Sequence, residues 1–327
     1  SASPKGIQVL RFFLRNNPKL RLGITADSLY RIIDIQDNYF QSTSAFYWLS
    51  SCQEGQELLS DIFYYNPQLL QDLPADALCL ARPAKISNYG DTSALFFLAS
   101  TELGIRILEN LLQINPEIAM GIKGEILSHV HVSRENVSIV YLLSSSTPGI
   151  GVLAHLFKIN PQLMLGVTSE AMNSRRSNVA GEYANTSFVY NLSVDQHGIC
   201  LLNQLFSTHL ELVAGVTIDT LCSPLPASAH QFENTSALYW LTKSIEGMQF
   251  LQYIFDKRPE LIQDMSMEYL CYPRPLSAKE YYNTSALYWL SGTLEGCIFL
   301  ANLFNKNPIL LKQIQAKDLC RTRPHMD

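Results

Sequence analysis

The sequence is poor in charge, since only 16% of its 327 residues are Asp, Glu, Lys or Arg. The 29 acidic residues outnumber the 24 basic ones and give a formal net charge of −5. Such a chain lacks the broad positive field that gathers phosphates. Single-strand RNA reading by helical repeats would need basic side chains and stackable aromatics along one groove. Nucleic acid is therefore not the expected partner.

Long apolar runs are also missing. No uninterrupted apolar stretch approaches the roughly 18 to 20 residues of a membrane span, and basic residues interrupt the first twenty positions. Neither a transmembrane segment nor a targeting signal is visible. Seven cysteines are an odd number at low density, and a chain with 47% apolar residues needs no disulfide framework. We expect a soluble, monomeric protein of a reducing cytoplasm.

Familiar catalytic motifs are also missing from the sequence. The chain has no glycine-rich phosphate loop, no Gly-x-Ser-x-Gly elbow, no His-Glu-x-x-His motif and no paired-cysteine metal knuckle. We therefore expect a non-catalytic protein with no cofactor and no metal. The alternative is an enzyme, or an enzyme-recruiting domain, with a site in the irregular middle of the chain.

What the sequence does contain is an internal repeat. A glycine recurs at intervals of 49 residues, with one interval of 45, and a proline follows twelve residues after six of the seven glycines. The glycines are Gly6, Gly55, Gly104, Gly149, Gly198, Gly247 and Gly296. The tract NTSALYWL occurs twice, one period apart, beginning at Asn234 and at Asn283. A fixed period of this length is typical of repeat architectures.

Each repeat predicts several helices. The residues three, four, seven and eight positions after every glycine are apolar and form one stripe of an α-helix. In the third repeat they are Ile107, Leu108, Leu111 and Leu112. The Asn-Pro pairs that follow end this helix and start another. Stretches such as Thr217 to Leu221 combine a hydroxyl cap, an acid and an apolar anchor, which is typical of a short capped helix.

The repeated octet predicts a further helix upstream of each glycine. Its first column holds Ser42, Asp91, Asn136, Asn185, Asn234 and Asn283. These short polar side chains are good helix caps. The four asparagines also match glycosylation acceptors, but the Ser and Asp in the same column favour capping. We expect the first column to cap the octet helix, and the two main helices of each repeat to form a hairpin across the glycine.

These patterns predict an all-α chain, an α-solenoid of about seven 49-residue repeats, each a helix hairpin plus one or two short helices. The expected repeats are 1–41, 42–90, 91–135, 136–184, 185–233, 234–282 and 283–327. We expect a single domain over residues 1–327, with a bend around 127–210 where one repeat is four residues short. The first repeat lacks an octet helix, so we also expect a fragment of a longer protein, or a stack with irregular caps.

The stretch NTSALYWLSGTLEGCIFLANLFNKNP resembles an ankyrin repeat, with Thr284, Leu287 and the Leu303-Phe304 pair as the matching positions. The period of 49 rather than about 33 and the Asn-Pro corner depart from that family. In overall style the chain resembles the divergent helical-repeat effectors that intracellular bacteria inject into host cells. That resemblance implies a virulence-related protein that binds a host or bacterial protein, and delivery into a host cytosol.

One column of the octet is aromatic in every repeat and is predicted core. The neighbouring column contains Trp48, Trp240 and Trp289 towards the two ends and Asn191 in the middle. An amide buried without partners costs about 1 to 3 kcal/mol. This column therefore predicts either packing between repeats with a local polar exception, or a surface that faces a partner.

An arginine column follows the short capped helix and contains Arg82, Arg274 and Arg323. These side chains could bind acidic partners or satisfy carbonyl groups at helix ends, and the sequence leaves both open. Cysteines recur nearby at Cys79, Cys222, Cys271 and Cys320. One repeat apart, they are too far separated for a zinc site and are predicted to be buried.

The middle of the chain breaks the repeat pattern. His129 and His131 lie beside the four-residue deletion, and Arg175 and Arg176 are adjacent in a long polar stretch. A His-x-His pair alone is a weak metal pattern. Functional sites in repeat proteins tend to lie where the sequence departs from the repeat pattern. We expect a curved surface that binds a protein partner and includes these four residues.

Overall fold

The computed structural model describes residues 4–33, 41–83, 90–131, 134–177 and 184–319. Within these ranges the regular structure is entirely helical, with no strand, and isolated bridges join Ile33 with Thr43 and Arg175 with Ser187. The all-α prediction is confirmed. None of the helices in these ranges combines the length and the apolar character needed to cross a membrane.

The chain divides into two compact units. The first comprises Ser1–Arg134 and Ser138–Val167, and the second comprises Glu135–Val137 and Thr168–Asp327. The predicted bend around 127–210 extends over both units and stays a prediction.

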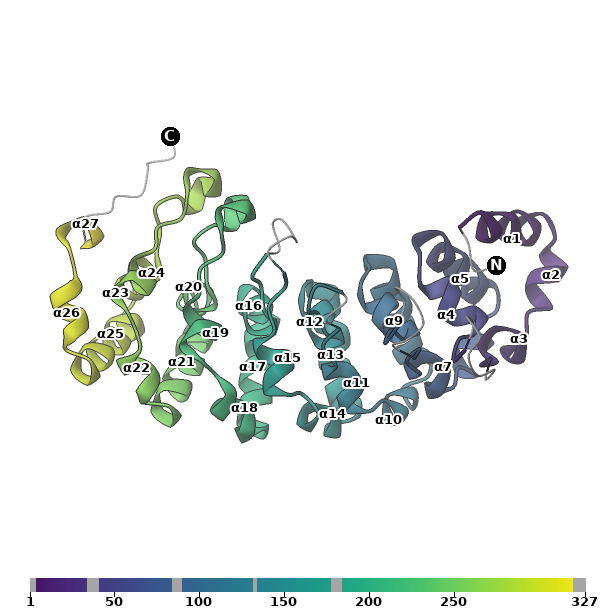
Figure 1. The fold of residues 1–327 in the computed structure, drawn as a ribbon, viewed down its shortest axis with the longest axis horizontal. Helices are drawn as coiled ribbons and strands as arrows, with labels where there is room; N and C mark the ends of the chain where they lie inside the picture. Colours follow the sequence, from purple (N-terminus) through teal and green to yellow (C-terminus); the bar gives the residue numbers. More distant parts are fainter. Residues whose placement is uncertain (1–3, 34–40, 84–89, 132–133, 178–183, 320–327) are drawn as a thin grey trace. The chain divides into compact units, whose positions relative to one another are not determined.

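The first unit contains fourteen helices in its described residues. They are α1 (Pro4–Asn16), α2 (Pro18–Leu22), α3 (Ala26–Tyr30), α4 (Ala45–Ser50), α5 (Gln53–Tyr65), α6 (Gln68–Gln71), α7 (Ala75–Cys79), α8 (Ala94–Ala99), α9 (Glu102–Ile114), α10 (Ile118–Gly121), α11 (Gly124–Ser128), α12 (Ile139–Ser144), α13 (Thr147–Ile159) and α14 (Gln162–Leu165). Figure 1 shows α5, α9 and α13 side by side, and α4, α8 and α12 form the neighbouring row.

The second unit repeats this arrangement. Its helices are α15 (Ser169–Asn173), α16 (Phe188–Val194), α17 (Gln196–Thr208), α18 (Leu210–Gly215), α19 (Ile218–Cys222), η4 (Ala227–Phe232), α20 (Ala237–Leu241), α21 (Ile245–Lys257), α22 (Glu260–Gln263), α23 (Met267–Cys271), η5 (Leu276–Tyr281), α24 (Ala286–Ser291), α25 (Leu294–Lys306), α26 (Ile309–Gln313) and α27 (Ala316–Leu319). The helices α17, α21 and α25 lie side by side in Figure 1, and α16, α20 and α24 pack in a second row. The 3-10 helices η4 and η5 contact each other.

The predicted cap of the octet helix is wrong by two residues. The first-column residues have φ values between 56° and 64°, which no N-cap adopts. Asn and Asp tolerate this left-handed region, which explains why they dominate the column. The third residue of the octet is the cap instead. Ser236, for example, accepts a hydrogen bond from the backbone N–H of Tyr239 at 3.2 Å.

The recurring glycine lies inside a helix rather than in the turn of a hairpin. The long helix begins two residues before it, so Gly104 is the third residue of α9. A Cβ at Gly104 would lie 2.2 Å from the carbonyl oxygen of Leu98 at the end of α8. Its N–H donates to the capping hydroxyl of Thr101 at 3.0 Å. The glycine is thus required by the close crossing of the two helices.

The Asn-Pro corner and the short capped helix form as predicted. Asn115 ends α9 and donates through Nδ2 to the carbonyl oxygens of Leu70, Gln71 and Leu73, the closest at 3.0 Å. The same position makes the equivalent contact in four further repeats. The side chains Asn66, Asn160, Arg258 and Asn307 donate to backbone carbonyls 41 to 45 residues earlier in the chain.

The hydroxyl caps of the short helices are confirmed at Thr25, Thr168, Thr217 and Ser266, each of which accepts a backbone N–H bond. The cysteine column is buried at Cys79, Cys222 and Cys271, as predicted, while Cys320 lies outside the described residues. Burial raises the pKa of the Cys79 thiol to about 12. Thiols in this state pack as small apolar groups and are poor nucleophiles.

Candidate functional site

The site begins with a buried cation, Arg274, which follows the short helix α23. Its side chain is 3% exposed. The guanidinium carbon lies 5.5 Å from the ring centroids of Tyr239 and Trp240 and 5.6 Å from that of Tyr281. At these distances an arginine interacts favourably with the electron-rich faces of aromatic rings. Three rings of the repeat 234–282 therefore surround this charge.

The hydrogen bonding of Arg274 is incomplete. Its Nη2 atom donates to the backbone carbonyl of Gln231 in η4. Its Nε and Nη1 atoms are buried without a hydrogen-bond partner, and no carboxylate of the described residues forms an ion pair with it. A buried donor that lacks an acceptor costs about 1 to 3 kcal/mol, and more when it is charged.

A cavity of about 330 Å³ adjoins this cation. Its described lining consists of Gln231, Phe232, Trp240, Arg274, Ala278, Lys279 and Tyr281. The lining therefore combines three aromatic rings with two cations and includes no carboxylate. An apolar cavity with a few convergent polar groups is the usual form of a binding site.

A second cation, Lys243, lies against the same aromatic cluster. Its Nζ atom is 4.3 Å from the Tyr281 ring centroid, 4.7 Å from that of Trp240 and 5.2 Å from that of Trp289. The Trp289 Nε1 atom is buried and has no acceptor. The region around Arg274 is thus locally positive, although the whole chain carries a net charge of −5.

Hydrogen bonds fix the tyrosine and tryptophan side chains of this aromatic cluster. The Tyr190 hydroxyl lies 2.8 Å from Thr235 Oγ1 and accepts a hydrogen bond from Trp240 Nε1 at 3.2 Å. Burial raises the pKa of this phenol, so it stays protonated. Tyr239 makes the equivalent contact with Thr284 at 2.8 Å. Fixed ring positions hold the Arg274 guanidinium in one geometry.

The remaining tryptophan-column residues are divided between the interior and the surface. Trp48 is buried and donates to Thr43 Oγ1 at 3.0 Å, with the Arg82 guanidinium 5.2 Å from its ring. Trp240 is also buried, whereas Asn191 and Trp289 are half-buried. The arginine–tryptophan stack thus occurs in both units. Arg323 lies outside the described residues.

The two adjacent arginines bind the protein's own chain and point to different partners. Arg175 donates to the backbone carbonyl of Asp219 at 2.6 Å and to Ser223 Oγ at 3.0 Å. Arg176 forms an ion pair with Glu135 at 2.5 Å. Both arginines therefore support the loops of the second unit and do not form one cationic patch.

The two histidines do come together. The His131 ring lies 4.8 Å from the His129 ring and 4.2 Å from Phe96, and His129 Nε2 is 3.3 Å from Asp91 Oδ2. The pKa of His131 is lowered to about 4, chiefly by burial, with smaller contributions from His129 and Arg134 in the same direction and an opposing one from Asp91. No group of three or more potential metal ligands occurs in the parts of the chain that the structure describes.

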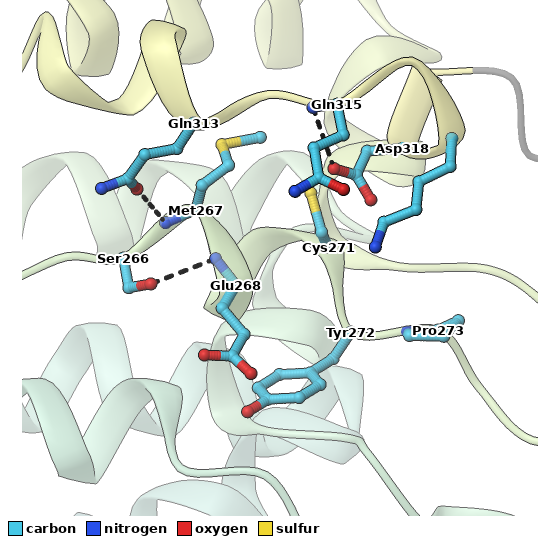
Figure 2. A pocket seen from close by; sticks show the side chains of 10 residues that line it. Ser266, Met267, Glu268, Cys271, Tyr272, Pro273, Gln313, Gln315 and Asp318 are labelled. Carbon is cyan, nitrogen blue, oxygen red and sulfur yellow. Dashed lines mark hydrogen bonds between the residues drawn. The ribbon is translucent and has the colours of Figure 1, made fainter.

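A second cavity, of about 410 Å³, lies between α23 and the two last helices (Figure 2). Its polar side chains already serve the backbone. Gln313 Oε1 accepts from the N–H of Met267 at 3.1 Å, and Ser266 Oγ accepts from that of Glu268 at 3.2 Å. Asp318 Oδ2 accepts from the N–H of Gln315 at 3.2 Å. These polar groups are already bonded as helix caps. This cavity therefore offers a ligand fewer hydrogen-bonding groups than the cavity beside Arg274 does.

Sequence reasoning singled out Trp240, Trp289 and Arg274 but missed Phe232, Tyr281, Lys243 and Lys279. A signal for three of these was present. Phe232 and Tyr281 are both aromatic and stand 49 residues apart, as do His230 and Lys279, which are both basic residue types. No protein-family model matches the chain, and no match was found among curated proteins or among solved structures. The described residues define an all-helical protein with an aromatic and cationic cavity in its second unit.

Proposed function

We propose that the chain is an α-solenoid of about seven helical repeats that binds a protein partner and carries out no catalysis itself. It would act as an effector, adaptor or regulator in a reducing cytoplasm, as a monomer. The resemblance to ankyrin-like repeats and to effectors of intracellular bacteria is part of this proposal. Repeat stacks of this kind expose long surfaces suited to protein recognition.

The hydrogen bonds between successive repeats carry the proposal. Within each unit, a side chain at the end of the long helix donates to the carbonyls of the preceding corner, as Asn115 and Asn307 do. A helix end leaves such carbonyls without partners inside its own helix. The repeats that carry these side chains therefore complete the bonding of a neighbouring repeat, which supports a linear stack.

Proximity cross-linking with the full chain in a reducing cytosolic extract, followed by quantitative mass spectrometry, tests this function. We expect specific enrichment of one or a few proteins, with the purified chain leaving small molecules of the extract unchanged. Lys279→Glu, at the cavity, should reduce the enrichment several-fold. Lys257→Glu is the matched control because Lys257 is also exposed in the second unit and lies outside the cavity lining. Conversion of a metabolite without enrichment of any protein would contradict the proposal.

A further inference from the structure

We propose that the cavity beside Arg274 binds a carboxylate of an acidic segment in the protein partner. This inference rests on the proposed function and names the chemistry of the partner. It accounts for a buried cation that has no counter-ion in the part of the chain that the structure describes, next to a cavity whose described lining includes no carboxylate.

The uncompensated charge is the first argument. Arg274 is 3% exposed, and its Nε and Nη1 atoms have no acceptor among the described residues. Guanidinium groups match carboxylates in shape and in hydrogen-bonding geometry. A carboxylate that enters the cavity would supply both the missing acceptor and the missing negative charge. A neutral amide or an apolar side chain would supply at most one of these.

The second argument is the composition of the cavity around the cation. Lys279 contributes a further positive charge, while Phe232, Trp240 and Tyr281 contribute aromatic surface. A volume of about 330 Å³ is roughly ten times that of a single water molecule. It can therefore admit a side chain with the backbone that carries it. Aromatic rings and arginine are also the residue types enriched where protein interfaces bind most strongly.

The third argument is the backbone at Lys279, which has φ 51° and ψ −113° inside η5. This conformation favours glycine, and other residues held in such regions are concentrated at binding sites. His230 has the same conformation in η4, 49 residues earlier. The corresponding arginine position there is occupied by Leu225, which is buried. Of these two equivalent loops, only the second is preceded in sequence by a buried arginine.

The test is a selection of random peptides displayed on phage against the full chain under reducing conditions. We expect the recovered peptides to be enriched in Asp and Glu. A synthesised lead peptide should bind at least about tenfold more tightly by calorimetry than its Glu→Gln version, as expected for hydrogen bonds to charged groups. Arg274→Met should weaken binding about tenfold or more, and the exposed Lys279→Glu several-fold. Lys257→Glu should leave it unchanged.

Thermal melting of Arg274→Met checks its folding, and Lys279→Glu keeps the test decisive if that variant fails to fold. Recovered peptides without acid enrichment, or binding that ignores both substitutions, would overturn the inference while the proposed function stands. Failure to recover any peptide would overturn it as well. Preferential binding of a single-stranded RNA oligonucleotide with the same dependence on Arg274 would assign the cavity to a phosphate backbone. If the cross-linking experiment described above enriches no protein, the proposed function itself would be contradicted.

Discussion

One position of the repeat carries a histidine at His131 and an arginine at Arg82 and Arg274. His131 and Arg274 both lie 27 residues after a repeat glycine. His131 stacks on Phe96, and Arg274 lies over Tyr239, which occupies the same octet column as Phe96. Both side chains are nearly inaccessible, at 4% and 3% exposed.

The two residues respond to burial in opposite ways. Burial lowers the pKa of His131 to about 4, so the imidazole is neutral at pH 7. Arginine cannot lose its proton in a protein and stays charged. The same position of the repeat is therefore a neutral packing position at His131 and a fixed cation at Arg274. Arg82 occupies this position in the first unit as well, so the difference is one between repeats rather than between the two units.

The largest expected effect tests whether the two regions unfold separately. Gly104→Ala and Gly247→Ala each place a Cβ 2.2 Å from a backbone carbonyl, which we expect to cost more than about 3 kcal/mol. Hydrogen exchange measured by mass spectrometry should show loss of protection in the first unit for Gly104→Ala and in the second unit for Gly247→Ala.

Gly151→Ala is the control for both variants. A Cβ at Gly151 meets nothing within 4 Å, and the residue is exposed on α13. We expect it to stabilise the protein by roughly 0.5 to 1 kcal/mol, since alanine favours helix more than glycine does. Equal loss of protection in both units with either damaging variant would contradict separate unfolding.

The next effect is a dependence of stability on pH in the first unit. Because the folded pKa of His131 is lowered from its ordinary value to about 4, the unfolded chain binds the proton more readily. Stability is then fully present above about pH 6.5 and falls as the pH decreases towards 4, by up to roughly 3 kcal/mol. Urea unfolding followed by hydrogen exchange at several pH values should show this loss around α8 and α9.

His131→Leu should remove most of that dependence. His197→Asn is the matched control, because the His197 side chain is 83% exposed and near Asp195. An unchanged pH profile in His131→Leu would show that other groups titrate.

The smallest effect concerns the hydroxyl pairs that join successive repeats. Tyr47 pairs with Thr92 in the first unit, and Tyr239 pairs with Thr284 in the second, both at 2.8 Å. We expect a coupling energy of about 1 kcal/mol in the double-mutant cycle of Tyr239→Phe and Thr284→Val. Thr284→Val should cost more than Tyr239→Phe because Thr284 also donates to the Tyr281 carbonyl.

The equivalent cycle with Tyr47→Phe and Thr92→Val compares the two units directly. Additive costs in denaturant unfolding would show that the pairs contribute no specific energy. The sequence itself contains one such double replacement, since Phe96 and Val137 occupy the tyrosine and threonine positions of one repeat pair.

Much of the local structure could be predicted from the sequence. The stripe that follows the glycine is buried in the inner repeats, as at Ile107 and Leu111, but Val9 and Phe13 in the first repeat are exposed. The Asn-Pro corners end their helices. The octet cap was wrong because Asn and Ser are both good caps by residue type. Only the backbone, with φ near +60° at the first position, distinguishes the residue that turns from the one that caps.

The candidate site could be predicted only in part. The register of the repeat pointed to Trp240, Trp289 and Arg274, because these residues differ from their neighbours in a column. It could not show that Arg175 and Arg176 bond to the protein's own backbone and acidic side chains, because those acceptors lie more than 40 residues away in sequence.

The sequence by itself determined the helical period, the apolar faces and the corners, because these depend on residues within a few turns of one another. The tertiary structure decided which charges are buried, which rings surround them and which donors lack an acceptor. Desolvation and hydrogen bonding depend on neighbours about one repeat away. For this reason His131 is neutral and Arg274 is a buried cation surrounded by aromatic rings, although the two occupy the same position of the repeat.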